Sequence, residues 1–416
     1  MKNIWILNHY ASTMFLDNGG RHYYIAKHLK AMGFSPTIIC ASTIHNSNEE
    51  IGSYVKDKNF HTEIKDDIKY IFIKTRIYED NGLKRVLNMI DFFKNLLKSK
   101  KKIANIAGKP DVIYASSVHP LTLIAGINLS KYFKAKNISE VRDLWPESLI
   151  AYNIIKSNSL IAKLLYLGEK NIYKRAEEIV MTWPGGQKYI KLKGWENEID
   201  LNKIRHISNG VDLQSFDSSK RANLNKIKSQ YFNDTYRHII YTGSIRKVNN
   251  ITLLVEVAKK CELENMDNIV FDIFGDGSER KLIEEMIENY GLKNIRLHGK
   301  VPKEFIPAIL NFGYINILHN KSTILDKYGQ SQNKLFEYLA AGNCILQTYR
   351  TNYSIIEEKK CGLIASEQTA EQIFKQIVFL NKNPENVKQM GKNARKASKS
   401  YDYKLLTNNL VELIGR

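Results

Sequence analysis

Short apolar runs alternate with amphipathic stretches along the whole chain, and this alternation restricts the fold more than any other feature. Runs such as Asn3–Leu7 and Ile269–Phe274 have the length and composition of buried strands. Stretches such as Glu279–Tyr290 repeat their apolar residues with the helical period. Strands that alternate with helices form parallel sheets with helices on both faces. The pattern therefore predicts an α/β protein.

The strand candidates fall into two successive groups, which predicts two α/β domains in tandem. In the first half they are Asn3–Leu7, Thr37–Cys40, Tyr70–Ile73, Val112–Ala115, Ile138–Val141 and Ile179–Met181. In the second half they are His238–Thr242, Ile269–Phe274, Ile295–Leu297, Ile315–Leu318 and Cys344–Gln347. A length of 416 residues also favours two domains over one. We expect residues 1–200, joined by a terminal helix at about 397–416, to form the first domain and residues 201–396 the second.

Composition excludes fewer classes of function than the alternation of strands and helices does. No stretch of about 18 or more uncharged apolar residues occurs, and the opening MKNIWILNHY is typical of a strand rather than of a signal peptide. The cysteines are scattered without metal-ligand spacing, which indicates reduced thiols and a cytoplasmic protein. The formal charge of +19 favours an anionic partner, although lysines that only keep a protein soluble give the same charge.

Glycines follow two of the strand candidates at places that suit a phosphate group. Gly19–Gly20 follows the first strand, and Gly275 and Gly277 follow Ile269–Phe274. Glycine lets backbone N–H groups approach an anion at the start of a helix. A plain tight turn explains the same residues equally well.

The junction after the strand candidate that ends at Thr242 is more specific. Gly243 and Ser244 come shortly before Arg246 and Lys247, and a helical pattern follows. The start of a helix attracts anions, and two cations beside it favour a phosphate group. A solvated basic loop is the alternative.

The most informative stretch is YGQSQNKLFEYLAAG at residues 328–342. We expect Ser331 to cap a helix that ends at Gly342, so that the N–H groups of Gln332–Lys334 face a ligand beside the lysine ammonium. Glu337 lies one turn further along and can accept two hydrogen bonds from ribose hydroxyls. An ordinary helix with a surface Glu–Lys pair fits the same residues.

Taken in order, these motifs resemble glycosyltransferase family 4, whose GT-B fold has two Rossmann-like domains facing a central cleft. The resemblance covers nearly the whole chain. Its specific parts are EVRDLWPES at Glu140–Ser148, ISNGVD at Ile207–Asp212 and NKLFEYLAAG at Asn333–Gly342. The first of these, with SSVHPLTLIAG at Ser116–Gly126, is similar to fucosamine-transferase-like enzymes of bacterial surface-polysaccharide synthesis.

The resemblance implies a retaining, metal-independent hexosyl- or N-acetylaminosugar transferase. Its donor would be a nucleoside-diphosphate sugar, UDP-linked, and it would need no cofactor. The acceptor would be a lipid-linked saccharide of O-antigen or capsule synthesis, at the cytoplasmic face of the inner membrane. Without a metal, protein cations must neutralise the leaving diphosphate.

Site residues follow from the same resemblance. His119, Arg246 and Lys334 take the catalytic positions, and Asp143 takes a position that holds the acceptor or the sugar. The donor contacts fall on Gly19, Gly20, Gly243, Ser244, Lys247, Gly275, Val301, Ser331, Gln332, Asn333, Leu335 and Glu337. No metal ligands are expected.

Two departures from the family pattern concern the donor. Glu337 matches the second carboxylate of the family's Glu-x7-Glu motif, the ribose binder, but the first carboxylate, which meets the donor sugar, is replaced by Gly329. The family's lysine after the strand glycine is replaced by Asn249 or Asn250, and Lys247 is the candidate substitute. The motif therefore does not fix the donor sugar.

Two of the predicted site residues, both in the first half of the chain, could have structural roles instead. His119 resembles the family's histidine that contacts the transferred sugar, but a ring N–H that caps a loop is a competing role. Asp143 follows a strand candidate, where an ion pair with Arg142 competes with a bond to an acceptor hydroxyl.

Residues 84–102, KRVLNMIDFFKNLLKSKKK, read as a basic amphipathic helix. Phe92 and Phe93 lie on its apolar side, and Asp91 is its one acid. Such a helix can lie on an anionic membrane. A helix that packs its apolar side into the domain core is the alternative, and the resemblance favours the membrane.

Two other functions fit parts of the pattern. A related GT-B enzyme, such as a sugar-nucleotide epimerase or a phosphorylase, would share the fold. The charge alone also fits a non-enzymatic protein that binds polyanions or nucleic acid. No recognised nucleic-acid motif occurs, so we expect no nucleic-acid partner.

Overall fold

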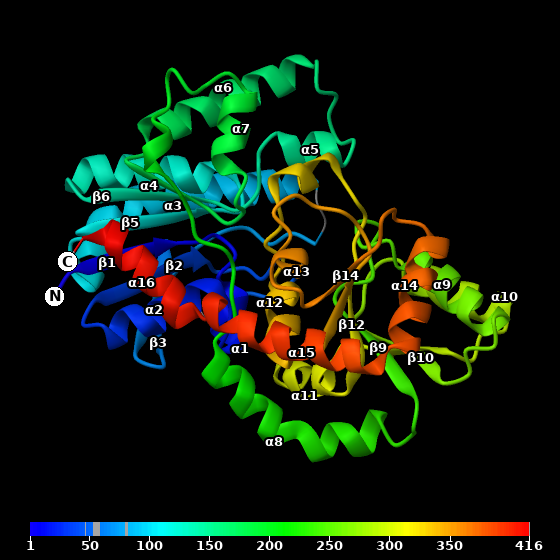
Figure 1. The fold of residues 1–416 in the computed structure, drawn as a ribbon. Coiled ribbons are helices and arrows are strands. Elements are labelled where there is room, and N and C mark those ends of the chain that lie inside the picture. The colour runs from blue at the N-terminus through cyan, green and yellow to red at the C-terminus, as the bar shows by residue number, and fades with distance from the viewer. Residues whose placement is uncertain (46, 53–58, 80–81, 416) are drawn as a thin grey trace. The chain divides into compact units, whose positions relative to one another are not determined.

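The computed structural model describes residues 1–45, 47–52, 59–79 and 82–415, which form two compact units. Unit 1 comprises Met1–Ser208 and the C-terminal segment from Tyr403, and unit 2 comprises Asn209–Asp402. The chain therefore leaves unit 1 after Ser208 rather than at residue 200, and returns at Tyr403 rather than at 397. Each unit contains one sheet with helices on both faces (Figure 1).

Unit 1 is built on an eight-stranded sheet in the order β3-β4-β2-β1-β5-β6-β7-β8. The strands are β1 (Asn3–Leu7), β2 (Ser35–Ala41), β3 (Phe60–Lys65), β4 (Ile68–Ile73), β5 (Val112–Ser117), β6 (Lys136–Val141), β7 (Glu178–Met181) and β8 (Ile204–His206). Neighbouring strands are parallel, except that the edge strand β3 runs antiparallel to β4. The sequence pattern missed β3, which exposes most of its side chains, and β8, which has only three residues.

The helices of unit 1 include the last one in the chain. They are α1 (Ser12–Asp17), α2 (Arg21–Ala31), α3 (Leu83–Ala107), α4 (Pro120–Phe133), α5 (Glu147–Ala151), α6 (Leu160–Arg175), α7 (Gly186–Leu192) and α16 (Tyr403–Ile414). Helix α16 packs against α2. Its Leu406 and Leu410 lie in the same core as Ile4 and Ile6 of β1. The C-terminal helix therefore completes the core that the first strand begins.

Unit 2 contains a fully parallel six-stranded sheet in the order β11-β10-β9-β12-β13-β14. The strands are β9 (Arg237–Thr242), β10 (Ile269–Phe274), β11 (Ile295–Gly299), β12 (Gly313–Leu318), β13 (Cys344–Gln347) and β14 (Gly362–Ile364). The short β14 is the one that the sequence pattern missed.

Strand β9 shows how this sheet contributes side chains to two hydrophobic cores, one on each face. Ile239 and Tyr241 point to one face, whereas Ile240 points to the other, as successive strand residues must. The first face is covered mainly by α9 (Ile251–Leu263), α10 (Arg280–Tyr290) and α14 (Ala370–Lys382). The second is covered by α8 (Leu213–Tyr231), α11 (Ile306–Asn311), α12 (Asn333–Ala341), α13 (Ile355–Glu358) and α15 (Pro384–Ser398). Burial on both faces explains the continuous apolar runs of the sequence.

The basic segment 84–102 forms most of α3, and its apolar side packs into unit 1. Phe92 and Leu96 are fully buried, and Phe93 is half-buried, whereas Lys94 and Lys98 are exposed. Phe92 therefore belongs to the core and is not available to a membrane. Across the described residues, no helix combines the length and the hydropathy that a membrane span requires.

A buried carboxylate, Glu140 of β6, organises the centre of unit 1. It accepts hydrogen bonds from Arg21 Nε at 2.6 Å, His22 Nε2 at 3.0 Å and Ser116 Oγ at 2.7 Å, and from the Tyr114 hydroxyl. Burial raises its pKa, but the Arg21 and His22 contacts outweigh this and hold the pKa well below its usual range.

Arg21 extends this cluster to the end of unit 1. Its guanidinium also donates to the carbonyl of Ile207 at 3.0 Å and to the carbonyl of Ser208. The segment in which the chain leaves unit 1 is therefore fixed to the sheet through Arg21 and Glu140.

Replacing Glu140 by Gln should destabilise unit 1 by about 3–5 kcal/mol, because a buried arginine loses its counter-charge. The stabilisation by Glu140 is present above its unfolded pKa and is lost as the pH falls toward its lowered folded pKa, so the difference from wild type should shrink in acid. Chemical denaturation followed at unit 1 tryptophans measures both effects. The control is Glu198→Gln, which removes only exposed ion pairs with Lys170 and Lys174 and should hardly change stability. Equal stability of the two variants would contradict the assignment.

Candidate functional site

In unit 2, the carboxyl ends of β9, β10 and β11 are joined through their own backbone. The Gly243 N–H donates to the Phe274 carbonyl at 2.9 Å, and the Gly275 N–H donates to the Gly299 carbonyl at 2.8 Å. A Cβ on Gly275 would lie 1.7 Å from the Gly243 carbonyl oxygen, so a larger residue does not fit. Both predicted glycines thus already use their N–H groups, and their role in the structure is close packing of the strand ends.

The loop from β9 to α9 carries the predicted cations. Ser244 Oγ donates to Asn249 Oδ1 at 2.9 Å and accepts from Arg246 Nε at 3.0 Å. Arg246 and Lys247 are both exposed. Asn249, one of the two positions where the resemblance expects a lysine, therefore shapes the loop and anchors Ser244.

Ser331 does not cap α12 as the sequence predicted. The N-cap residue is Gln332, and its side chain makes no capping bond. Instead, Ser331 Oγ accepts from the Asn209 N–H at 2.8 Å, and the Ser331 carbonyl accepts from Asn209 Nδ2 at 2.5 Å. The N–H groups of Asn333 and Lys334 in the first turn have no intrahelical acceptor, which leaves partial positive charge at the helix start.

Lys334 adds a full charge at the same helix start. Its Nζ donates to the His319 carbonyl at 2.7 Å and lies 4.5 Å from the centre of the Tyr241 ring. Burial lowers its pKa to about 7, and no carboxylate of the described residues compensates. An anion bound beside it would stabilise the ammonium form.

His319 is a supporting residue that the sequence reasoning missed. Its Nε2–H donates to the Asn250 carbonyl at 2.8 Å, and the Thr348 hydroxyl donates to its Nδ1 at 2.6 Å. Burial lowers its pKa to about 3, so the ring is neutral near pH 7. Its position directly after β12, at the carboxyl edge of the sheet, was the signal available in the sequence.

A network of amides and one phenol surrounds the loop before α12. Gln332 Nε2 donates to Asn320 Oδ1 at 2.5 Å and to the Tyr349 hydroxyl at 2.9 Å. The Tyr349 hydroxyl donates to Gln330 Oε1 at 2.5 Å, and Gln330 Nε2 donates to Gln347 Oε1 at 2.7 Å. These bonds fix the loop that leads into the helix start. The Gln332 Oε1 atom is buried and has no partner among the described residues.

The remaining donor positions lie in or next to the same part of unit 2. Glu337 is half-buried in α12, and no described residue forms a hydrogen bond or ion pair with its carboxylate. Burial raises its pKa, while Lys303 opposes the shift. Leu335 is fully buried and its N–H donates to the Gln332 carbonyl at 3.1 Å, whereas Val301 is half-buried just after β11.

His119 of unit 1 is buried at the start of α4 and belongs to a chain of three side chains. Its Nε2 lies 2.9 Å from His9 Nδ1, and His9 Nε2 lies 2.7 Å from Asn88 Oδ1. Burial lowers the pKa of His9 to about 3 and, with the nearby His9 and Arg85, lowers that of His119 well below its ordinary value. Both rings are therefore neutral.

Asn88 determines which ring nitrogens carry protons. Its Nδ2 donates to Thr43 Oγ1 at 3.0 Å and to the Arg76 carbonyl at 2.5 Å, so its Oδ1 must accept from His9 Nε2–H. His9 Nδ1 then accepts from His119 Nε2–H. The His119 Nδ1 atom is left as a buried acceptor without a partner among the described residues. The alternative role, a ring N–H that caps a loop, is not observed within the described chain, because His119 Nε2 contacts the side chains of His9 and Thr122 instead of a backbone carbonyl.

The other predicted residues of unit 1 have simpler surroundings. Asp143 is exposed after β6, and the Arg142 charge acts on it without a direct ion pair in the described chain. The predicted loop before the glycine pair contains α1, and the Gly19 N–H donates to the Met14 carbonyl at 3.4 Å. Gly20 has a φ of 106°, which favours glycine.

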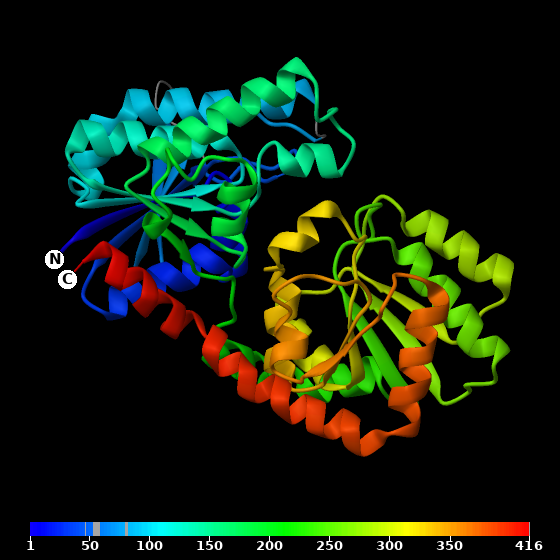
Figure 2. The same cartoon turned by 45° about the horizontal axis from the view of Figure 1, so that its top comes forward.

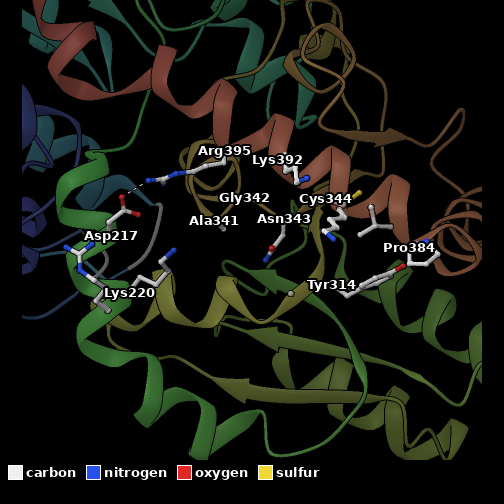
Figure 3. A pocket seen from close by; sticks show the side chains of 15 residues that line it. Asp217, Lys220, Tyr314, Ala341, Gly342, Asn343, Cys344, Pro384, Lys392 and Arg395 are labelled. Atoms are coloured by element: carbon white, nitrogen blue, oxygen red, sulfur yellow. Dashed lines mark hydrogen bonds and ion pairs between the residues drawn. The ribbon is translucent and has the colours of Figure 1, made fainter.

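A cavity of about 720 Å³ lies at the opposite edge of the unit 2 sheet (Figure 3). Tyr314 and Cys344, at the beginnings of β12 and β13, form part of its wall. Arg395 of α15 donates to Asp217 of α8 at 2.5 Å beside it. Because the candidate donor residues lie at the carboxyl edge of the same sheet, this cavity is a separate feature.

Residues 223–397 match the family model described as glycosyl transferases group 1. The chain is also 23% identical over 151 residues to WcaI of Escherichia coli (strain K12), a protein named for a glycosyl transfer step in colanic acid biosynthesis. That alignment spans 36% of this chain and 36% of the relative, so it covers about a third of either protein.

Solved structures align over the whole length of the chain. Sucrose-phosphate synthase (tll1590) from Thermosynechococcus elongatus has a TM-score of 0.72 and 16% identity, covering 99% of this chain and 98% of that one. Anabaena Alr3699/HepE, in complex with UDP and glucose, has a TM-score of 0.68 and 12% identity, covering 100% and 99%. These similarities confirm the predicted α/β fold class of GT-B type. Over residues 223–397 of its second unit, the chain therefore carries a glycosyl transferases group 1 domain.

Proposed function

We propose that the protein is a retaining glycosyltransferase that moves a sugar from a UDP-sugar to a lipid-linked saccharide acceptor in cell-surface polysaccharide synthesis. Lys334 carries this proposal, because it is a half-buried cation at an uncapped helix start and has no carboxylate partner among the described residues. A diphosphate supplies the negative charge that such a place lacks. The group 1 domain supports glycosyl transfer, and the HepE complex with UDP and glucose supports the choice of a UDP-linked donor.

In the proposed reaction, the bond between the anomeric carbon and the diphosphate oxygen breaks, and its electron pair goes to UDP. Lys334, Arg246 and the first N–H groups of α12 stabilise the charge that develops on the diphosphate. Glu337 accepts hydrogen bonds from the ribose hydroxyls. The acceptor hydroxyl forms the new bond on the same face of the sugar and gives its proton to the leaving phosphate. A side-chain base and a metal ion are then not required.

His119 takes the sugar-positioning role in this proposal. Its Nδ1 is a neutral, buried acceptor whose orientation and protonation depend on His9 and Asn88. A sugar hydroxyl can donate to it. His119 therefore orients the donor sugar and does not exchange a proton with it.

The name of WcaI, which refers to colanic acid biosynthesis, supports a role in polysaccharide synthesis. We place the enzyme in the cytoplasm at the inner-membrane surface, where a lipid-linked acceptor is accessible. Exposed lysines of α3, such as Lys94 and Lys98, would strengthen attraction to anionic lipid.

Replacing Arg246 or Lys334 by Ala should lower turnover roughly ten- to a hundredfold, since a charge-assisted bond to phosphate contributes about 1.5–3 kcal/mol. Lys281→Ala, which changes an exposed lysine on α10, is the control and should behave like wild type. Steady-state transfer rates measure the effect. Wild-type turnover of both site variants would remove these residues from the site.

The pKa of Lys334 predicts a pH dependence of UDP binding. With a pKa of about 7 in the free protein, the lysine loses its proton above neutral pH, whereas a bound diphosphate favours the ammonium. The affinity for UDP should therefore fall as the pH rises above 7, by up to about tenfold per pH unit. Calorimetric titration of wild type and Lys334→Ala tests this. The variant should bind weakly with a flat profile in the alkaline range, and a parallel profile in both proteins would refute the role.

Replacing His119 by Ala should lower turnover while the dissociation constant for UDP stays near that of wild type. Asn88→Leu should also lower turnover, because it removes the acceptor that determines which ring nitrogens of His9 and His119 carry protons. Turnover and calorimetric binding of UDP, compared for both variants, separate sugar positioning from nucleotide binding. An inverted anomer in the product, seen by NMR, would exclude the retaining mechanism and redirect attention to Asp143 as a base.

Transfer should continue when EDTA is present, because protein cations take the place of a metal in the proposed site. Product formation before and after dialysis against the chelator measures this. Loss of activity that magnesium or manganese restores would show that the diphosphate is neutralised by a metal.

A further inference from the structure

Helix α6 of unit 1 is apolar on its outward side as well as on its inward side. Ala162, Ile172 and Tyr173 are buried against the unit. On the opposite side, Leu160, Leu164 and Leu167 follow one another at helical spacing and are 72%, 59% and 64% exposed. A helix with apolar residues on both sides requires a second apolar environment.

The outward surface continues into neighbouring positions. Ile161 of α6 is 60% exposed, and Ile154, between α5 and α6, is 65% exposed. We name Ile154, Leu160, Ile161, Leu164 and Leu167 the α6 patch. Single exposed apolar residues are ordinary, whereas a group of them on one element marks an interaction surface. Figure 2 shows α6 along the outside of unit 1.

The charges within the stretch of sequence that contains the α6 patch have one sign. Lys156 and Lys163 are exposed, and residues 148–168 include neither Asp nor Glu. The nearest acids are already paired: Glu147 forms an ion pair with Lys193, and Glu169 accepts from Tyr173 and Tyr189. Further along α6, Lys170 and Lys174 pair with the exposed Glu198. The patch therefore presents leucine and isoleucine side chains together with the charges of Lys156 and Lys163, which form no ion pair within the described chain.

We infer that the α6 patch docks unit 1 on an anionic lipid bilayer. Apolar side chains enter the boundary between headgroups and acyl chains, while lysines next to them contact lipid phosphates. A symmetric contact with a second copy would bring Lys156 and Lys163 of both copies together, and residues 148–168 contain no acid to pair with them. The inference rests on the proposed function for its purpose, because docking brings the enzyme to a lipid-linked acceptor.

The test is flotation of the full-length protein with phosphatidylcholine vesicles, with and without phosphatidylglycerol. Leu160→Gln combined with Leu164→Gln should lower the bound fraction about tenfold or more, because the apolar contact is lost. The control combines Leu263→Gln and Leu282→Gln in unit 2, which are 72% and 44% exposed, and should float like wild type. Lys156→Gln with Lys163→Gln should reduce the preference for phosphatidylglycerol and its sensitivity to salt.

Melting temperatures of all variants should match that of wild type, because the changed side chains are exposed. Ile154 lies outside the helix, so flotation of Ile154→Ser tests the same surface independently if the double variant of α6 folds poorly. Failure of wild type to bind either vesicle, or equal flotation of the α6 patch variant, would overturn the inference. So would a wild-type dimer that the variant dissociates and that does not bind vesicles. UDP calorimetry on the same samples is independent of vesicles, so absence of UDP binding would reject the proposed function separately.

Discussion

Parallel strand pairing is the constraint on which the candidate donor site depends. Because all strands of the unit 2 sheet run in the same direction, the loops that follow β9, β10, β11 and β12 emerge at one edge. Residues far apart in the chain, such as Arg246, His319 and Lys334, thereby belong to a single rim. The glycine contacts between strand ends add stiffness to this rim, since Gly243 and Gly275 approach too closely for side chains. A preorganised rim allows charged groups to act without rearrangement.

Local patterns were sufficient for most of the fold, and contacts over long sequence separations explain what was missed. Strands β1, β10 and β13 have the predicted bounds because each is a short, mainly apolar run. The prediction that Ser331 caps α12 was wrong, because Ser331 instead bonds Asn209, which is 122 positions away in the sequence. The link from His119 to His9 spans 110 positions, and no local pattern signals it. Motif recognition found the residues that bear charge, but not the neutral groups that orient them.

Glu140 of unit 1 and Lys334 of unit 2 are compensated in opposite ways. In unit 1, Glu140 is fully satisfied by donors, so its charge serves structure. In unit 2, Lys334 is satisfied only by neutral acceptors, and Glu337 has no partner within the described chain. A satisfied ion stabilises one arrangement, whereas an incompletely compensated one gains most when a ligand arrives. This contrast distinguishes a structural cluster from a candidate binding site more reliably than the presence of charge does.

The position of α16 has a consequence for synthesis on the ribosome. Unit 1 begins with the first strand, yet Tyr403, Leu406, Leu410 and Ile414 of the last helix complete its core. Unit 2 is a continuous segment that leaves the ribosome earlier than α16 does. Unit 1, although it begins first, therefore keeps part of its apolar surface uncovered until α16 has been synthesised, whereas unit 2 can fold before that. Premature termination near residue 400 would thus damage the N-terminal half of the protein, and such an exposed core is a natural substrate for chaperones.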